Sequence, residues 1–392
     1  MRGHIVKRSE NSWSVVLSLG RDPVTGKRRQ QWSTVRGTKR DAERRLTELL
    51  HSLEMGGYVK PERLTVGEFL ERWLRDYVAT NTAPSTSVNY VMICGHHLIP
   101  SLSFLPLMRL EPQHLQRYYA EKLKAGLSPR TVLHHHRVIY EALKYTVKWG
   151  LVVRNVAEAV DAPRPERSQM NVMTPDDVPI FLDAAKGSPF YDFFFVKLFT
   201  GMRRGELLGL RWRDVDLEMA NVSVSRSLQR LSGHGFIFRE PKSAKGRRQV
   251  ALPPSAALVL RDHRKQAEAA KSLLGMELTD DDLVFGHVDG SPQDPSSITH
   301  AFIRVVRKAG LNGIRLHDLR HTHASLMLKQ GVHPKIVSER LGHSTISITL
   351  DIYSHVLPGL QEAAASKFEE GLSLTADVLR PATGRIAAEK IG

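Results

Sequence analysis

Cysteine and long apolar runs are both scarce in this chain. Cys94 is the only cysteine among 392 residues. An intrachain disulfide and a site built from several thiolates are therefore excluded, and a reducing compartment is expected. No apolar run reaches membrane-spanning length, the N-terminal residues lack the apolar core of a secretory signal, and no Gly-x-x-x-x-Gly-Lys-Ser/Thr motif of an NTPase occurs. These absences predict a cytoplasmic protein.

Positive charge, in contrast, is abundant. The formal net charge is +15, and residues 1–60 hold 13 Lys and Arg against 6 Asp and Glu. A polyanion is the simplest partner for so much positive charge, and nucleic acid is a better candidate than an anionic membrane surface. Because 41% of the residues are hydrophobic, the bulk of the chain should fold, and its length predicts two or three domains.

The hydrophobic pattern changes along the chain. Two strand-like runs and an amphipathic helix open it, at 13–19, 30–35 and 39–55. Four helices are predicted next, at 66–77, 85–98, 111–124 and 129–149, with Ser85 and Ser128 as helix caps. Helices then mix with clustered strand-like runs at 221–227, 236–239, 248–252 and 283–285, which favours an α+β arrangement. A further helix is predicted at 360–370.

These patterns predict a multidomain protein: a small N-terminal β-sheet plus helix, an all-α domain, and a mainly helical α+β domain. The predicted boundaries are 1–60, 64–153, a linker at 154–172, 173–365 and a tail at 366–392.

Five polar elements stand out in the last domain. They are Thr200–Leu207 (TGMRRGEL), Lys242 within PKS, His317–Arg320 (HDLR), Leu341–His343 (LGH) and Asp351–His355 (DIYSH). Two guanidinium groups can clamp the non-bridging oxygens of a phosphodiester, and a tyrosine beside cations becomes a nucleophile. The elements therefore suit phosphoryl transfer, although each alone is weak evidence.

In order and spacing these motifs resemble the tyrosine recombinase (phage integrase) family. The resemblance is strongest over residues 173–356. It implies that Tyr353 is the nucleophile, that Arg203 and Arg320 clamp the phosphate, and that His317 and His343 assist. Residues 1–60 look like the arm-type DNA-binding domain of phage and conjugative-transposon integrases, and residues 65–150 look like their helical core-binding domain.

Some assignments stay open at this point. Lys242 is the expected general acid, with Lys245 as the alternative, and Arg204 is a rival to Arg203. Glu206 is expected to orient an arginine, and His355 to support the site or lie at the surface. His317 and His321 have metal-ligand spacing without a matching acid or thiolate cluster, and His134–His136 is interpreted as helix surface. No metal and no cofactor is expected.

The resemblance implies site-specific integration and excision of a mobile element through a 3′-phosphotyrosyl intermediate. The expected partners are double-stranded DNA attachment sites of core and arm type and three further copies of the chain in a homotetramer. When bound to DNA, the protein is expected to be nucleoid-associated. An excisionase and a host DNA-bending protein are candidate helpers. The alternatives are a degenerate integrase that regulates without catalysis and a type IB topoisomerase-like enzyme.

Overall fold

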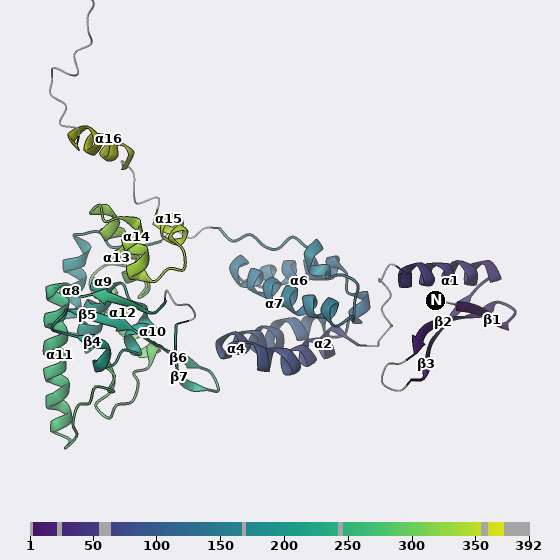
Figure 1. Ribbon diagram of the computed structural model, residues 1–392, viewed down its shortest axis with the longest axis horizontal. Coiled ribbons are helices and arrows are strands. Elements are labelled where there is room, and N and C mark those ends of the chain that lie inside the picture. The colour runs from purple at the N-terminus through teal and green to yellow at the C-terminus, as the bar shows by residue number, and fades with distance from the viewer. Residues whose placement is uncertain are drawn as a thin grey trace, which may run out of the picture. The chain divides into compact units, whose positions relative to one another are not determined.

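The computed structural model describes residues 3–21, 26–54, 64–166, 170–241, 246–353 and 360–371. The chain divides into two compact units, Met1–Arg167 and Ser168–Gly392. Figure 1 gives the order of the elements within each. Among the described helices, none combines the length with the apolar character that crossing a membrane requires.

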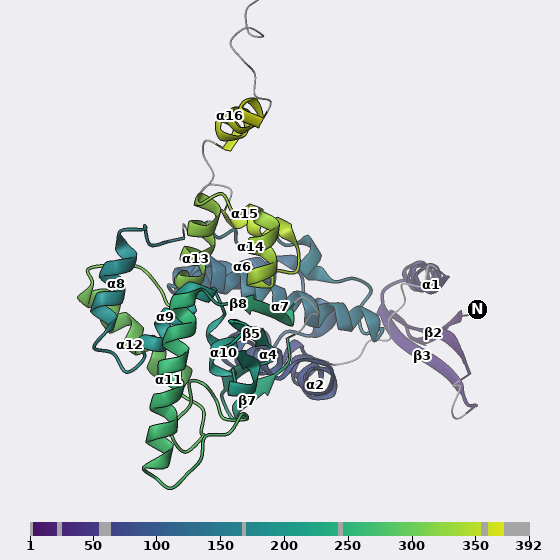
Figure 2. The same cartoon turned by 60° about the vertical axis from the view of Figure 1, so that its left-hand side comes forward.

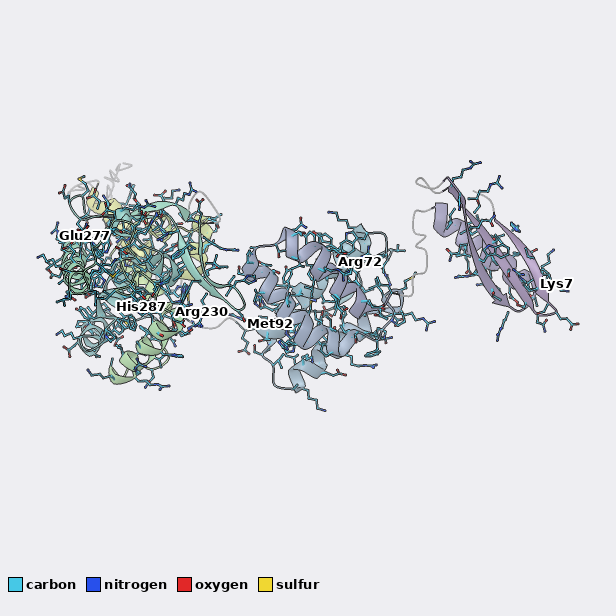
Figure 3. All side chains as sticks on the ribbon, turned by 90° about the horizontal axis from the view of Figure 1, so that it is seen from below. Lys7, Arg72, Met92, Arg230, Glu277 and His287 are labelled. Carbon is cyan, nitrogen blue, oxygen red and sulfur yellow. The ribbon has the colours of Figure 1, made fainter. Side chains whose placement is uncertain are left out.

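A three-stranded antiparallel sheet and one helix form the N-terminal module. The strands are β1 (Gly3–Ser9), β2 (Ser12–Arg21) and β3 (Arg28–Arg36), with β2 in the centre, and α1 (Lys39–Glu54) packs against β2. The predicted strands and helix are confirmed, whereas β1 was not predicted because its short apolar stretch lies among polar residues. The Lys7 side chain projects from β1 into solvent (Figure 3).

The four predicted helices of the following segment are confirmed. The elements are α2 (Val66–Trp73), α3 (Ala79–Asn81), α4 (Pro84–Ile93), α5 (Ile99–Leu102), α6 (Pro112–Lys124) and α7 (Pro129–Lys148), with π-helical turns at Leu74–Val78 and Cys94–Leu98. They enclose an apolar core that includes Trp73 and Leu115. Ser128 caps α7 as predicted, but Ala83 rather than Ser85 precedes α4, because Pro84 takes the first helical position.

Two expectations for this segment were wrong. His135 is buried rather than solvated, and its Nδ1 lies 2.9 Å from the Tyr118 hydroxyl, while His136 makes the same contact with Tyr119. The predicted linker also begins too early: Asn155 donates to the Tyr140 carbonyl at 3.1 Å, and Ala157 belongs to the helical core. The apolar residues Val156, Ala157 and Val160 pack into the helical core and so hold the start of this stretch against it.

The second unit is mainly helical. Its helices are α8 (Asp177–Ala185), α9 (Tyr191–Thr200), α10 (Arg204–Leu208), α11 (Pro254–Ser272), α12 (Pro295–Lys308), α13 (Asp318–Lys329), α14 (Pro334–Leu341), α15 (Ile346–Tyr353) and α16 (Leu360–Gly371). The main core gathers side chains from α8, α9, α11 and α12, including Phe181, Phe194 and Phe302. Helices α13, α14 and α15 lie side by side (Figures 1 and 2).

Two small sheets complete this unit. One has the order β4 (Val215–Asp216), β5 (Asn221–Val224), β8 (Arg248–Ala251), and the other pairs β6 (Ser227–Leu231) with β7 (Gly235–Arg239). The run predicted at 221–227 breaks into β5 and β6 at Ser225 and Arg226, whose side chains donate to Asp214 and to the Gly209 carbonyl. Residues 283–285 form an isolated bridge at Leu283, not the expected strand.

Candidate active site

A tight turn after α9 begins the site. Helix α9 ends at Thr200, and Gly201 adopts the left-handed conformation at φ +67°. A Cβ atom at Gly201 would lie 2.7 Å from His323 Cδ2 and 2.8 Å from Leu341 Cδ2, so only glycine fits both the backbone and the space. This turn brings Arg203 against the end of α14.

Arg203 and Arg204 diverge from the start of α10. Arg203 Nη1 donates to Glu206 Oε1 at 2.8 Å, and its Nη2 reaches the Gly342 carbonyl at 3.4 Å. Arg204 Nη1 instead donates to Thr299 Oγ1 at 2.8 Å and to the Pro295 carbonyl at 3.2 Å, both on α12. Of these two neighbouring arginines, Arg203 is therefore the one that contacts the segment carrying His343.

Arg320 contacts both the turn after α9 and the C-terminal end of α14. It is 2% exposed. Its Nη1 donates to the Gly201 carbonyl at 2.8 Å and its Nη2 to the Leu341 carbonyl at 2.6 Å. A planar fork can hold two carbonyls in fixed directions, which an ammonium cannot. The buried guanidinium thus ties the turn before Arg203 to the turn before His343.

Glu206 is the acidic residue of a cluster of cations that includes Lys197, Arg203, Arg248 and Arg320. It accepts hydrogen bonds from Arg203 and, at 3.1 and 2.9 Å, from both terminal nitrogens of Arg248 on β8. Burial raises the pKa of Glu206, but the hydrogen bonds and charges of Arg248 and then Arg203 outweigh it and lower the pKa to about 2. The carboxylate is ionised at neutral pH and orients two arginines.

Two histidines flank the arginines. His317 precedes α13 at the rim, and His343 follows the left-handed Gly342 that ends α14. Partial burial is the main cause that lowers the pKa of each ring to about 4. The charges of Lys197 and His321 lower the pKa of His317 further, and those of Arg320 and Arg203 lower the pKa of His343 further. Both rings are neutral at pH 7. His343 Nδ1 lies 2.8 Å from the buried Thr349 hydroxyl, and when that hydroxyl donates, the ring proton stays on Nε2.

Tyr353 is the last residue of α15, a helix that starts three residues after His343. Its side chain lies outside the described part of the structure. Lys242, Lys245 and His355 also lie outside the described residues. Among the residues that are described, no group of His, Cys, Asp and Glu side chains could hold a metal ion.

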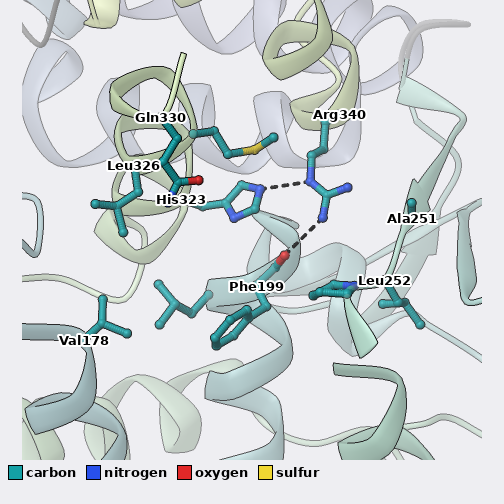
Figure 4. A pocket seen from close by; sticks show the side chains of 11 residues that line it. Val178, Phe199, Ala251, Leu252, His323, Leu326, Gln330 and Arg340 are labelled. Carbon is teal, nitrogen blue, oxygen red and sulfur yellow. Dashed lines mark hydrogen bonds between the residues drawn. The ribbon is translucent and has the colours of Figure 1, made fainter. Parts of the chain in front are cut away.

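Two pockets border the cluster. One, of about 210 Å³, is lined by residues that include the cations Arg247, Arg248 and Lys335, the acid Glu339 and His343. The other, of about 470 Å³ and mainly apolar, is lined by residues that include Phe199, His323 and Arg340. There Arg340 donates to His323 Nε2 at 3.0 Å and to the Phe199 carbonyl at 3.1 Å (Figure 4).

Sequence reasoning missed two cations of the cluster. Arg248 was noted only as the first residue of the strand-like run at 248–252, although its position two residues before Val250, on the same face of that strand, was a usable signal. Lys197 was not noted at all. It is the single charge in the apolar run from Phe193 to Phe199, and it is fully buried. A lysine is rarely buried without a reason, so that isolation was a signal too.

Comparisons with known proteins agree with this geometry. Residues 171–359 match the phage integrase family, and residues 65–123 match the phage integrase N-terminal SAM-like domain. A tyrosine recombinase XerC-like protein of Caldanaerobacter subterraneus is 28% identical, over 90% of this chain and 94% of that protein. The ICEBs1 integrase of Bacillus subtilis is 24% identical, over 93% of this chain and 99% of that protein.

Two solved structures share the fold. The Tn1549 transposon integrase, in complex with a circular intermediate DNA, has a TM-score of 0.67 at 22% identity and covers 78% of this chain and 99% of its own. A lambda integrase tetramer bound to a Holliday junction has a TM-score of 0.56 at 19% identity and covers 89% of this chain and 94% of its own.

Fold and family together define a multidomain DNA strand-exchange enzyme of the integrase type. The chain belongs to the phage integrase family of tyrosine recombinases, and it is a site-specific DNA recombinase.

Proposed function

We propose that this recombinase integrates and excises a mobile DNA element, prophage or conjugative, through a 3′-phosphotyrosyl intermediate on Tyr353. The observation that carries the proposal is that Arg203 and Arg320 both donate to backbone carbonyls just before His343, and that Arg320 also holds the turn before Arg203. Relatives named as integrases of ICEBs1 and of mycobacteriophage D29 support the mobile-element role.

The residues divide the phosphoryl transfer among them. The Tyr353 oxygen forms a bond to phosphorus while the bond from phosphorus to the 5′ oxygen breaks. Arg203 and Arg320 stabilise the charge on the non-bridging oxygens. His343, neutral with its proton on Nε2, donates a hydrogen bond to one of those oxygens.

Protons must also move. The phenol loses its proton to a base, for which neutral His317 is suited, and the leaving 5′ oxygen gains one from Lys242, or from Lys245 in its place. A 5′-hydroxyl of a partner strand then attacks the phosphotyrosine, which restores Tyr353 and one phosphodiester. Because one ester replaces another, no ATP is consumed.

Strand exchange between two duplexes requires four active sites, so we infer a homotetramer on two core sites. The lambda integrase tetramer on a Holliday junction is a precedent of the same fold. The basic N-terminal module suits a separate arm site, with an excisionase and a host DNA-bending protein as accessory partners.

The test is covalent capture. Purified protein in EDTA is incubated with a supercoiled plasmid that carries the DNA flanking its own gene, and denaturing gels detect protein-linked DNA. Wild-type protein should form the complex and Tyr353→Phe should not. Intact DNA binding without any complex would instead identify a degenerate integrase that acts as a regulator. Relaxed plasmid without recombinant product would indicate a topoisomerase-like enzyme.

A further inference from the structure

Lys197 lies in the last turn of α9, and it contacts the turn that carries Arg203 twice. Its backbone carbonyl accepts from the Gly201 N–H at 3.0 Å, and its Nζ donates to the Met202 carbonyl at 2.9 Å. Side chain and main chain of one residue thus hold two successive residues of the turn. The Gly201 carbonyl between these contacts is the one that holds Arg320 at 2.8 Å.

The environment of this lysine is unfavourable for a cation. Its side chain is fully buried, and the acceptor of Nζ is a neutral carbonyl. The charged groups that face it are cationic Arg320, Arg204 and Arg203 and anionic Glu206, and the neutral rings of His317 and His321 lie near. Burial and then Arg320 lower the pKa of Lys197 to about 7, and Glu206 opposes this only in part.

A second lysine of the same unit shows the usual solution. Lys271 on α11 is 6% exposed, and its Nζ lies 2.7 Å from Asp282 Oδ2. A buried ammonium with a carboxylate partner is neutralised within the fold. Lys197 lacks that compensation although an apolar side chain of similar length would fit an apolar helix. Stability alone does not account for a lysine at this position.

We propose that Lys197 is a positioning residue for the two phosphate-binding arginines. It fixes the Met202 carbonyl, and through it the directions from which Arg203 leaves the turn and the Gly201 carbonyl meets Arg320. This role rests on the proposed function of those arginines. Four methylene groups span the distance from the helix to the turn, and the terminal nitrogen satisfies a carbonyl that would otherwise be buried without a partner.

The test is Lys197→Met, which keeps the length and removes the donor and the charge. We expect covalent-complex formation in single turnover to slow by about tenfold to hundredfold, because small displacements of catalytic groups cost that much. DNA affinity, which depends on many phosphate contacts, should stay within about twofold. The melting temperature at pH 7 should change little, because removal of an unfavourable buried charge offsets the loss of the donor to the buried Met202 carbonyl.

Lys271→Met is the matched control. It leaves the partly buried Asp282 without its cation, so the melting temperature should fall while the cleavage rate of the folded protein is unchanged. Lys197→Met with a cleavage rate near that of wild type would overturn the positioning role. A large fall in the melting temperature or loss of folding would also overturn it, because either would make Lys197 a structural residue. If wild-type protein itself forms no covalent complex, the proposed function fails and this role fails with it.

Discussion

Helix α9 meets opposite electrostatic surroundings at its two ends. Near its start, Asp192 accepts a hydrogen bond from His263 at 2.7 Å, and the other ring nitrogen of His263 lies 2.8 Å from the Val284 carbonyl. Near its end, Lys197 donates to a carbonyl among three arginines. One end is charge-compensated and the other is not.

The same contrast extends over the unit. Around α11, Lys271 pairs with Asp282, and Arg211 and Arg213 reach Asp281. In the cluster of Lys197, Arg203, Arg248 and Arg320, the described contacts supply one carboxylate, Glu206. Paired cations hold a fold together, whereas a buried excess of cations is ready for an anion from outside. The contrast separates structural charge from the candidate phosphate site.

The largest effect should follow Arg320→Lys. The substitution keeps the charge but cannot hold the Gly201 and Leu341 carbonyls together, so both turns lose their tie. Covalent-complex formation should fall by about a hundredfold to a thousandfold, the range for loss of one transition-state donor. Single-turnover capture measures it, and a rate near wild type would remove Arg320 from the phosphate site.

Glu206→Gln tests the single acid of the cluster. Gln cannot neutralise Arg203 and Arg248, so cleavage should slow by about tenfold, and the free energy of unfolding should fall by roughly 3 kcal/mol, as when one partner of a buried pair is removed. Denaturant unfolding and covalent capture measure the two effects.

The pH dependence of the same variant gives a second readout. The folded pKa of Glu206 is about 2, below its ordinary value of 4.5, so its stabilising contribution is full above pH 4.5 and is lost as the pH falls from 4.5 toward 2. Wild type should lose more stability than Glu206→Gln over that window. Equal losses in the two proteins would contradict the ion pairs.

Much of the fold was predictable because its signals are local. Helix α7 follows from Ser128, Pro129 and an apolar period, and β2 from the apolar run Val15–Leu17. The break between β5 and β6 was not predictable from local pattern, and the side chains at the break, Ser225 and Arg226, contact residues 11 and 17 positions away. Propensity does not contain such tertiary contacts.

The site divides in the same way. The motif around Arg203 and the spacing of His317 and Arg320 were visible as patterns, and the structure brings Arg203 and Arg320 to shared turns. Arg248 was not assigned to the site, because its approach to Glu206 spans 42 residues of sequence and depends on how β8 pairs with β5.

A smaller effect is expected at the compensated end of α9. Asp192→Asn removes the charge that faces His263 while it keeps an acceptor, and both side chains are partly exposed. The free energy of unfolding should fall by about 1 kcal/mol, the usual net value of one such bond, and cleavage per folded molecule should not change. A large loss of cleavage with unchanged stability would erase the proposed distinction between the two ends.

Arg204→Ala should have only a small effect on cleavage, and this variant decides between the two neighbouring arginines. The side chain of Arg204 is engaged by Thr299 and Pro295 on α12, away from the Gly342 carbonyl that Arg203 contacts. Cleavage should stay within about threefold of wild type, against a loss of about a hundredfold or more for Arg203→Ala. Covalent capture of both variants at matched folded concentration gives the comparison. The reverse order would mean that the turn at Gly201 presents Arg204 to the phosphate, so that the contact of Arg203 with Glu206 is structural.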